Sequence, residues 1–233
     1  MPVSSKIRTL VAIVVVLAAC RPDFELKRFT QDTALSQASL RELQRRKWDN
    51  AVAGFERLTI ELPARDTLMP PSLFYLGRAR QGKKEWLLAA QAFTRVAESF
   101  PDDTLADDAI YEAGISYARL WRKPELDAQY GETAISTLRM MQSMYPNSPL
   151  NEKAQRDIDR LTNWLAIKTY RTALWYMRRK AFDPAIIYLK DVLRLYPSTP
   201  TARDAALKLV AAYKEINYRE EASEQCARLR ETY

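Results

Sequence analysis

The 233-residue sequence contains no histidine, which removes the usual general base and the commonest metal ligand. Its glycines are also few and scattered, so no glycine-rich loop exists whose backbone N–H groups would bind a phosphate. No Cys-x-x-Cys or Gly-x-Ser-x-Gly motif occurs. We therefore predict no catalytic residue, no cofactor and no metal site. Catalysis by Asp and Glu pairs alone, as in an enzyme of the cell wall, stays an alternative on these grounds.

The N-terminal segment carries the features of a bacterial signal peptide. Lys6 and Arg8 precede an apolar run from Leu10 to Ala19, and Leu17-Ala18-Ala19-Cys20 resembles a lipobox, whose cysteine is acylated after cleavage. A helix over that run spans about 15 Å, too short for a bilayer core of about 30 Å. We expect a signal peptide at residues 1–19, a lipid on Cys20 and a tether over residues 20–31. A plain secretory signal is the alternative.

The remaining residues are mildly basic and rich enough in apolar side chains to form a core. Because Lys6 and Arg8 are the only charges in residues 1–19, their removal lowers the net charge from +7 to +5. That charge does not predict binding to nucleic acid. We expect Cys226 to be a small buried hydrophobe, since no internal disulfide is possible beside a lipidated Cys20.

An internal repeat is visible when the chain is aligned on four prolines that follow a large apolar residue. A small residue precedes each proline by twelve positions, and a large one follows four positions later. The prolines are Pro63, Pro101, Pro146 and Pro197; the small residues are Ala51, Ala89, Ala134, Ala185 and, before Tyr233, Ala222; the large ones are Phe55, Phe93, Leu138 and Leu189, with Cys226 in the last repeat. This pattern is that of the second helix of a tetratricopeptide repeat. We predict an all-α, right-handed superhelix of about five such repeats over residues 32–233.

The spacing of the repeats predicts two irregularities. The prolines lie 38, 45 and 51 residues apart, where 34 is usual. In the third repeat the excess falls in residues 122–129. In the fourth, we expect a long helix at about Pro149 to Ile167 that precedes the repeat's own first helix.

Two candidate interaction surfaces follow from this register. The fourth repeat contains a cluster of basic residues interleaved with aromatic ones, a composition that favours docking on an acidic protein surface: Arg171, Arg178, Arg179, Lys180, Lys190 and Arg194. A solvated face and contact with anionic lipid are the alternatives.

The second candidate surface is a concave groove lined by first-helix positions, which we expect to hold an extended peptide that ends in an aromatic residue and a carboxylate. Its predicted residues are Phe74, Arg78, Tyr111, Ile115 and Arg119. Ordinary packing between repeats is the alternative there. We expect the nearby acidic residues, Glu112 among them, to favour a helix N-terminus.

The lipobox, the tether and five repeats with an insertion in the third resemble the BamD family of outer-membrane β-barrel assembly lipoproteins. The residues from Tyr170 to Tyr213, notably LRLYPSTPTARDAALKLVAAY (193–213), carry the most specific part of the resemblance. It implies a non-catalytic scaffold, lipid-anchored on the periplasmic face of the outer membrane. Its implied partners are the POTRA domains of the barrel subunit, other assembly lipoproteins and unfolded outer-membrane proteins. An envelope adaptor of the Tol-associated cell-division coordinator type is the alternative, although that family is typically periplasmic with a coiled-coil N-terminus, which matches neither Cys20 nor the absence of heptads in this sequence.

Overall fold

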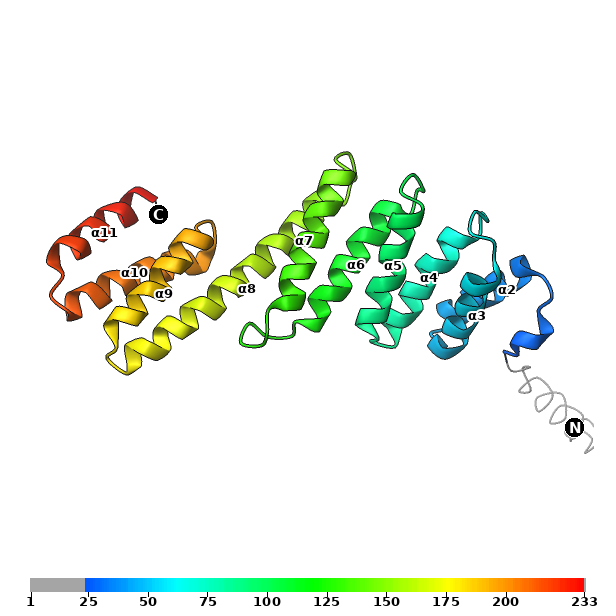
Figure 1. Cartoon of the computed structure of the whole chain (residues 1–233), viewed down its shortest axis with the longest axis horizontal. Helices are drawn as coiled ribbons and strands as arrows, with labels where there is room; N and C mark the ends of the chain where they lie inside the picture. The colour runs from blue at the N-terminus through cyan, green and yellow to red at the C-terminus, as the bar shows by residue number, and fades with distance from the viewer. Residues whose placement is uncertain (1–23, 233) are drawn as a thin grey trace, which may run out of the picture.

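The protein is an elongated row of antiparallel helix pairs (Figure 1). In this computed structural model, residues 24–232 are described, and within that range ten α-helices and one short 3-10 helix occur without any strand. The all-α expectation is therefore confirmed. The elements are η1 (Leu26–Arg28), α2 (Asp32–Gln44), α3 (Trp48–Glu61), α4 (Met69–Gly82), α5 (Trp86–Ser99), α6 (Ala106–Leu120), α7 (Gln129–Met144), α8 (Asn151–Arg178), α9 (Phe182–Leu195), α10 (Pro200–Glu215) and α11 (Arg219–Thr232).

Close packing within each pair depends on small residues at fixed positions. Ala51, Ala89, Ala134 and Ala185 are completely buried, as the repeat pattern predicts. In the second and third pairs the large residue four positions later, Phe93 or Leu138, packs on the first helix of the same pair, where Gly77 or Gly114 makes room for it. A Cβ built on Gly77 would lie 2.7 Å from the Phe93 ring. Helices that approach this closely leave one apolar face for the next pair to bury.

The prolines end the second helices, as expected. Helices α3, α5, α7 and α9 each stop two residues before the proline of their repeat. The residue between is non-helical, for example Leu62 with φ −68° and ψ 141°, because the proline ring disfavours α geometry in the residue before it. These turns fix where each new repeat begins.

Helix α8 corrects one expectation. We expected a helix at 149–167 followed by a separate one, but residues 151–178 form a single 28-residue helix. No glycine or proline lies between Pro149 and Pro184, so nothing in this stretch breaks the helix. Its first half packs into one core through Ile158 and Leu161, and its second half into another through Ala173.

The chain before α2 packs against the first helix pair. Phe24, Leu26 and Phe29 lie on the core of that pair, and the Arg57 side chain donates a 2.7 Å hydrogen bond to the carbonyl of Leu26. The expected tether is thus docked from Phe24 onward. The extra residues of the third repeat form the linker 121–128, which Trp121 ties to the core as a buried side chain. None of the described helices is long and apolar enough to cross a membrane.

Candidate functional site

Two adjoining cavities form one groove along the first helices of successive pairs. The first has a volume of about 710 Å³ and the second about 600 Å³. Glu112, Ile115 and Arg119 of α6 line both, so the two cavities are continuous. Their walls come mainly from α2 and α4 on one side of α6 and from α8 on the other. We call this continuous surface the groove.

Aromatic and aliphatic side chains make up much of the surface of the groove. Trp48 and Trp86 stand at the first positions of α3 and α5, and both line the first cavity. Trp164 of α8 lines the second and packs edge to face on Trp121, with ring centroids 5.4 Å apart. Half-buried rings of this kind offer large apolar contact areas to a ligand. The other apolar lining residues are Leu40, Leu43, Tyr75, Ile115 and Ala118.

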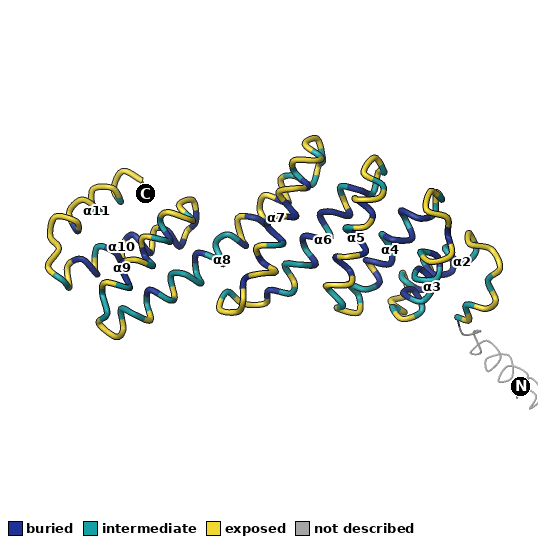
Figure 2. The backbone as a smooth tube through the Cα atoms, in the orientation of Figure 1, coloured by how far each residue is buried: buried dark blue, intermediate teal, exposed yellow. Residues whose placement is uncertain are grey.

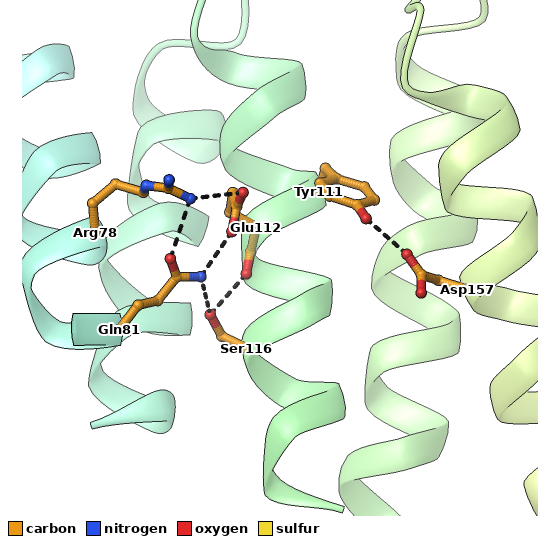
Figure 3. A network of polar contacts seen from close by, with 6 residues as sticks. All are labelled: Arg78, Gln81, Tyr111, Glu112, Ser116 and Asp157. Carbon is orange, nitrogen blue, oxygen red and sulfur yellow. Dashed lines mark hydrogen bonds and ion pairs between the residues drawn. The ribbon is translucent and has the colours of Figure 1, made fainter. Parts of the chain in front are cut away.

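A network of polar contacts ties α4 to α6 in the groove (Figure 3). The Arg78 guanidinium lies 2.9 Å from one carboxylate oxygen of Glu112, and the Gln81 amide donates to the other at 2.8 Å. The same amide also donates to the Ser116 hydroxyl at 3.0 Å. Glu112 therefore neutralises Arg78, a contact that its expected role at a helix N-terminus did not predict.

A second polar contact joins α6 to α8. The hydroxyl of buried Tyr111 donates to Asp157 at 2.7 Å, and Arg160 lies 2.7 Å from the other oxygen of that carboxylate. Burial raises the pKa of the Tyr111 phenol, and the neighbouring Asp157 carboxylate raises it further. The Lys153 ammonium stands 4.5 Å from the centroid of the Tyr111 ring. These contacts hold the two walls of the second cavity in register.

Three cations of the groove form no ion pair at contact distance with a described carboxylate: Arg119, Arg122 and Lys153. The Arg119 guanidinium lies 6.0 Å from the ring centroid of Trp86. Because Glu112 and Asp157 are already paired with Arg78 and Arg160, the groove keeps a surplus of positive charge. Apolar rings beside unpaired cations fit a ligand that presents both an aromatic side chain and a carboxylate.

The structure places four of the five predicted groove residues in the groove. Arg78, Ile115 and Arg119 line the first cavity, and Tyr111 lines the second. Phe74 lies outside both. Its ring packs edge to face on Phe93, with centroids 5.4 Å apart, because Gly77 leaves the space that Phe93 fills.

The basic residues of the fourth repeat do not gather on one face. Arg171 pairs with Glu125 of the 121–128 linker, whereas Lys190 and Arg194 line a cavity of about 430 Å³ beside α11. Arg178, Arg179 and Lys180 lie at the turn between α8 and α9, where the Arg179 guanidinium is 3.5 Å from the Trp175 ring centroid. The expectation of a single basic face is wrong, because Arg171 of α8 faces the 121–128 linker whereas Lys190 and Arg194 of α9 face α11.

Other predicted features are placed as follows. Cys20 lies outside the described residues. Within residues 24–232, no group of three or more Cys, Asp or Glu side chains is arranged to hold a metal ion. Cys226 is half-buried. The sequence analysis missed Trp48, Trp86 and Trp164, although a tryptophan at the first position of two successive second helices was a signal available in the sequence.

The paired helices and their groove define a repeat protein of the tetratricopeptide type. The chain matches the outer membrane lipoprotein family YfiO over residues 29–229, and it belongs to that family.

Two curated relatives are both described as outer membrane protein assembly factor BamD. The one from Caulobacter vibrioides is 27% identical over 185 residues, which are 77% of this chain and 59% of the relative. The one from Vibrio cholerae is 28% identical over 136 residues, 58% of this chain and 51% of the relative. The matched regions thus span between half and three fifths of these relatives. A solved structure of a thermophilic TPR protein from Thermus thermophilus is 21% identical with a TM-score of 0.41, covering 87% of this chain and 91% of that one.

Proposed function

We propose that the protein is a non-catalytic scaffold of outer-membrane protein assembly, anchored through a lipid on Cys20, and that its groove receives unfolded outer-membrane proteins. Membership of the outer membrane lipoprotein family and the similarity to two assembly factors support the process. The observation that carries the role of the groove is the pairing of apolar rings with the unpaired cations Arg119, Arg122 and Lys153.

The groove favours an extended peptide segment over a compact ligand. It runs across α2, α4, α6 and α8 rather than closing into a pocket. A peptide carboxylate beside Arg119 supplies the negative charge that this side chain lacks within the described chain. An aromatic side chain of the peptide packs on Trp48 or Trp86. Hydrogen bonds that involve a charged group contribute about 1.5 to 3 kcal/mol, so the carboxylate sets the orientation of the peptide.

We propose that the C-terminal repeats dock on the POTRA domains of the barrel subunit, with other assembly lipoproteins as further partners. Two features at the C-terminal end of α8 support this part. Trp175 is exposed and carries the Arg179 guanidinium on its ring, and Arg171 flanks the same cavity of about 410 Å³. Exposed aromatic and arginine side chains are the usual anchors of protein interfaces.

Peptide binding tests the groove. The probe is a fluorescent peptide of about twelve residues from the C-terminus of an outer-membrane β-barrel protein, ending in an aromatic residue and a free carboxylate, followed by anisotropy. Loss of one charge-assisted contact weakens binding roughly tenfold to a hundredfold, so Arg119→Gln should show that loss. Arg203→Gln, on the exposed surface of α10, is the matched control and should bind as the unmodified protein does.

Amidation of the peptide carboxylate gives the second arm of this experiment. It should weaken binding to the unmodified protein by about the same factor and should have little further effect in Arg119→Gln. Equal affinities for the free and amidated peptides would contradict the proposed orientation. No binding of either peptide would remove the substrate role from the groove.

A further inference from the structure

The same turn recurs where a first helix passes into its second helix. The turn residue adopts a left-handed conformation in four of these linkers: φ is 59° at Arg46, 63° at Lys84, 57° at Lys180 and 62° at Asn217. In each case the N–H of the turn residue donates a hydrogen bond to the carbonyl three residues earlier. The N–H of the next residue donates to the carbonyl five residues before it, as from Lys47 to Glu42 at 2.9 Å. This is the hydrogen-bond pattern that commonly ends helices.

Stability alone favours glycine at these positions. Left-handed geometry brings the Cβ of an L-residue close to the backbone, and glycine is the residue most often found there. Three of the four positions nevertheless hold a lysine or an arginine. None of these three side chains has a carboxylate partner among the described residues. Their charge is therefore available to something outside the described chain.

These linkers lie along one edge of the molecule. In Figure 1 they form the lower edge, and the linkers that join one pair to the next form the upper edge. We call the lower one the basic edge; it consists of residues 45–47, 83–85, 121–128, 179–181 and 216–218. The basic edge holds nine lysine and arginine residues and three carboxylates, whereas the upper linkers hold one arginine and three carboxylates.

Exposed aromatic side chains lie along the same edge. Three aromatic residues count as exposed in the described chain: Tyr130, Trp175 and Tyr218. Tyr130 is the second residue of α7, Trp175 stands three residues before the end of α8, and Tyr218 belongs to the linker before α11. Tryptophan and tyrosine beside lysine and arginine are typical of surfaces that meet lipid headgroups.

The described chain begins near this edge. Its first residue, Phe24, is fixed against the first pair, and the start of the described ribbon lies toward the lower edge in Figure 1. Cys20 precedes Phe24 by four residues, which span at most about 14 Å. A lipid on Cys20 would therefore enter a membrane close to the basic edge.

We propose that the N-terminal part of the basic edge, residues 45–47, 83–85 and 121–128, lies against the anionic lipid headgroups of a membrane surface, with the side chains of Arg46 and Lys84 in the headgroup layer. Residues 179–181 are left to the proposed POTRA contact. The opposite edge, with its surplus of carboxylates, then faces away from the lipid. This inference goes beyond the proposed function, because it stands whether or not the groove binds a peptide. An acidic protein on the same edge is the competing occupant.

The test uses the chain from residue 21 onward, without acyl chains, so that the edge alone decides binding. Sedimentation compares vesicles of phosphatidylcholine with vesicles that contain about 30% phosphatidylglycerol. The unmodified chain should bind only the anionic vesicles, and raising salt from about 50 to about 500 mM should release it.

The decisive variant is Arg46→Gly combined with Lys84→Gly. Both substitutions suit the left-handed geometry, so thermal unfolding should stay unchanged or rise, which separates loss of charge from loss of fold. Each cation near an anionic surface strengthens binding roughly fivefold, and the pair should therefore weaken it about 25-fold. Asn217→Gly changes the same kind of turn without changing charge and should bind as the unmodified chain does.

Both variant positions lie in the first two helix pairs, far along the chain from the proposed POTRA-docking repeats. Equal binding to both kinds of vesicle would overturn the proposal, and so would unchanged binding of the double variant. A third outcome would assign the edge to a protein instead. In that outcome the unmodified chain binds no vesicles, and the double variant no longer binds the purified periplasmic part of the barrel subunit. Peptide binding in the groove is measured separately, so failure of one proposal leaves the other standing.

Discussion

The N-terminal and C-terminal halves of the protein use the same helix pair for different surfaces. From α2 to the first half of α8, the first helices enclose the groove, and polar contacts such as Arg78 with Glu112 link one pair to the next. From the second half of α8 to α11, the cavity beside α11 has a volume of only about 430 Å³ and is lined mainly by charged and polar side chains. The last helix buries only Ala222. The repeat pattern therefore fixes the packing within pairs, while the residues on the first helices decide what each half can bind.

Helix α8 belongs to both halves, and buried positions recur along it from one end to the other (Figure 2). Ile158 packs in the second core and Ala173 in the third. Among the described helices, only α5 and α6 also contribute buried side chains to two of the three cores, and they join the first core to the second. We therefore expect the two halves to unfold together only as long as α8 is a continuous helix.

A proline in the middle of α8 should have the largest effect on this arrangement. Ile167→Pro removes a helix hydrogen bond and introduces a clash, at a cost of about 3 kcal/mol or more. We expect chemical denaturation followed by circular dichroism to split into two transitions, because each half keeps its own core. Ile167→Ala is the control and should unfold nearly as the unmodified protein does. A single transition at the original midpoint for Ile167→Pro would contradict the coupling role of α8.

Overpacking one half at a time should have the next largest effect. Ala89 and Ala185 are both completely buried at the same repeat position, one in each half. A tryptophan at either site should cost about 1 to 3 kcal/mol or more. Ala89→Trp should also abolish binding of the aromatic peptide, whereas Ala185→Trp should preserve it. Thermal unfolding and peptide anisotropy measure the two effects.

The matched controls for this pair lie two residues away on the same helices. Gln91 and Ile187 are exposed, so Gln91→Trp and Ile187→Trp should change the midpoint of unfolding little. If Ala89→Trp and Ala185→Trp weakened peptide binding equally, the groove would not be confined to the N-terminal half.

The sequence predicted the packing of the fold better than its surfaces. Proline and alanine act through their own backbone and size, so Ala89 and Pro101 marked the second helix of a pair correctly. The length of α8 was missed because the repeat pattern suggested a boundary where no helix-breaking residue exists. Phe74 was assigned to the groove because helix periodicity predicts which residues share one face of α4. Periodicity does not predict that Phe93, from α5, packs on the Phe74 ring. The pairing of Arg78 with Glu112 joins residues 34 positions apart, a contact that local patterns do not contain.

The smallest effect that we predict concerns the contact between α6 and α8, and it depends on pH. In Tyr111→Phe the hydrogen bond to Asp157 is lost while Asp157 keeps Arg160, so the variant should be about 1 kcal/mol less stable at neutral pH. Burial and the Asp157 carboxylate raise the pKa of Tyr111 above its ordinary value of 10.0. The phenol therefore stays neutral in the folded protein when it already ionises in the unfolded chain.

This difference makes the stabilisation by Tyr111 fully present below pH 10 and progressively lost as the pH rises from there toward the higher pKa of the folded state. The gap in unfolding free energy between the unmodified protein and Tyr111→Phe should accordingly narrow above about pH 10. Urea denaturation at a series of pH values measures it, with the exposed Tyr218→Phe as the control that shows no such gap. A gap that stays constant through this range would mean that the Tyr111 phenol ionises alike in the folded and unfolded states, which would contradict the raised pKa of this phenol in the folded protein.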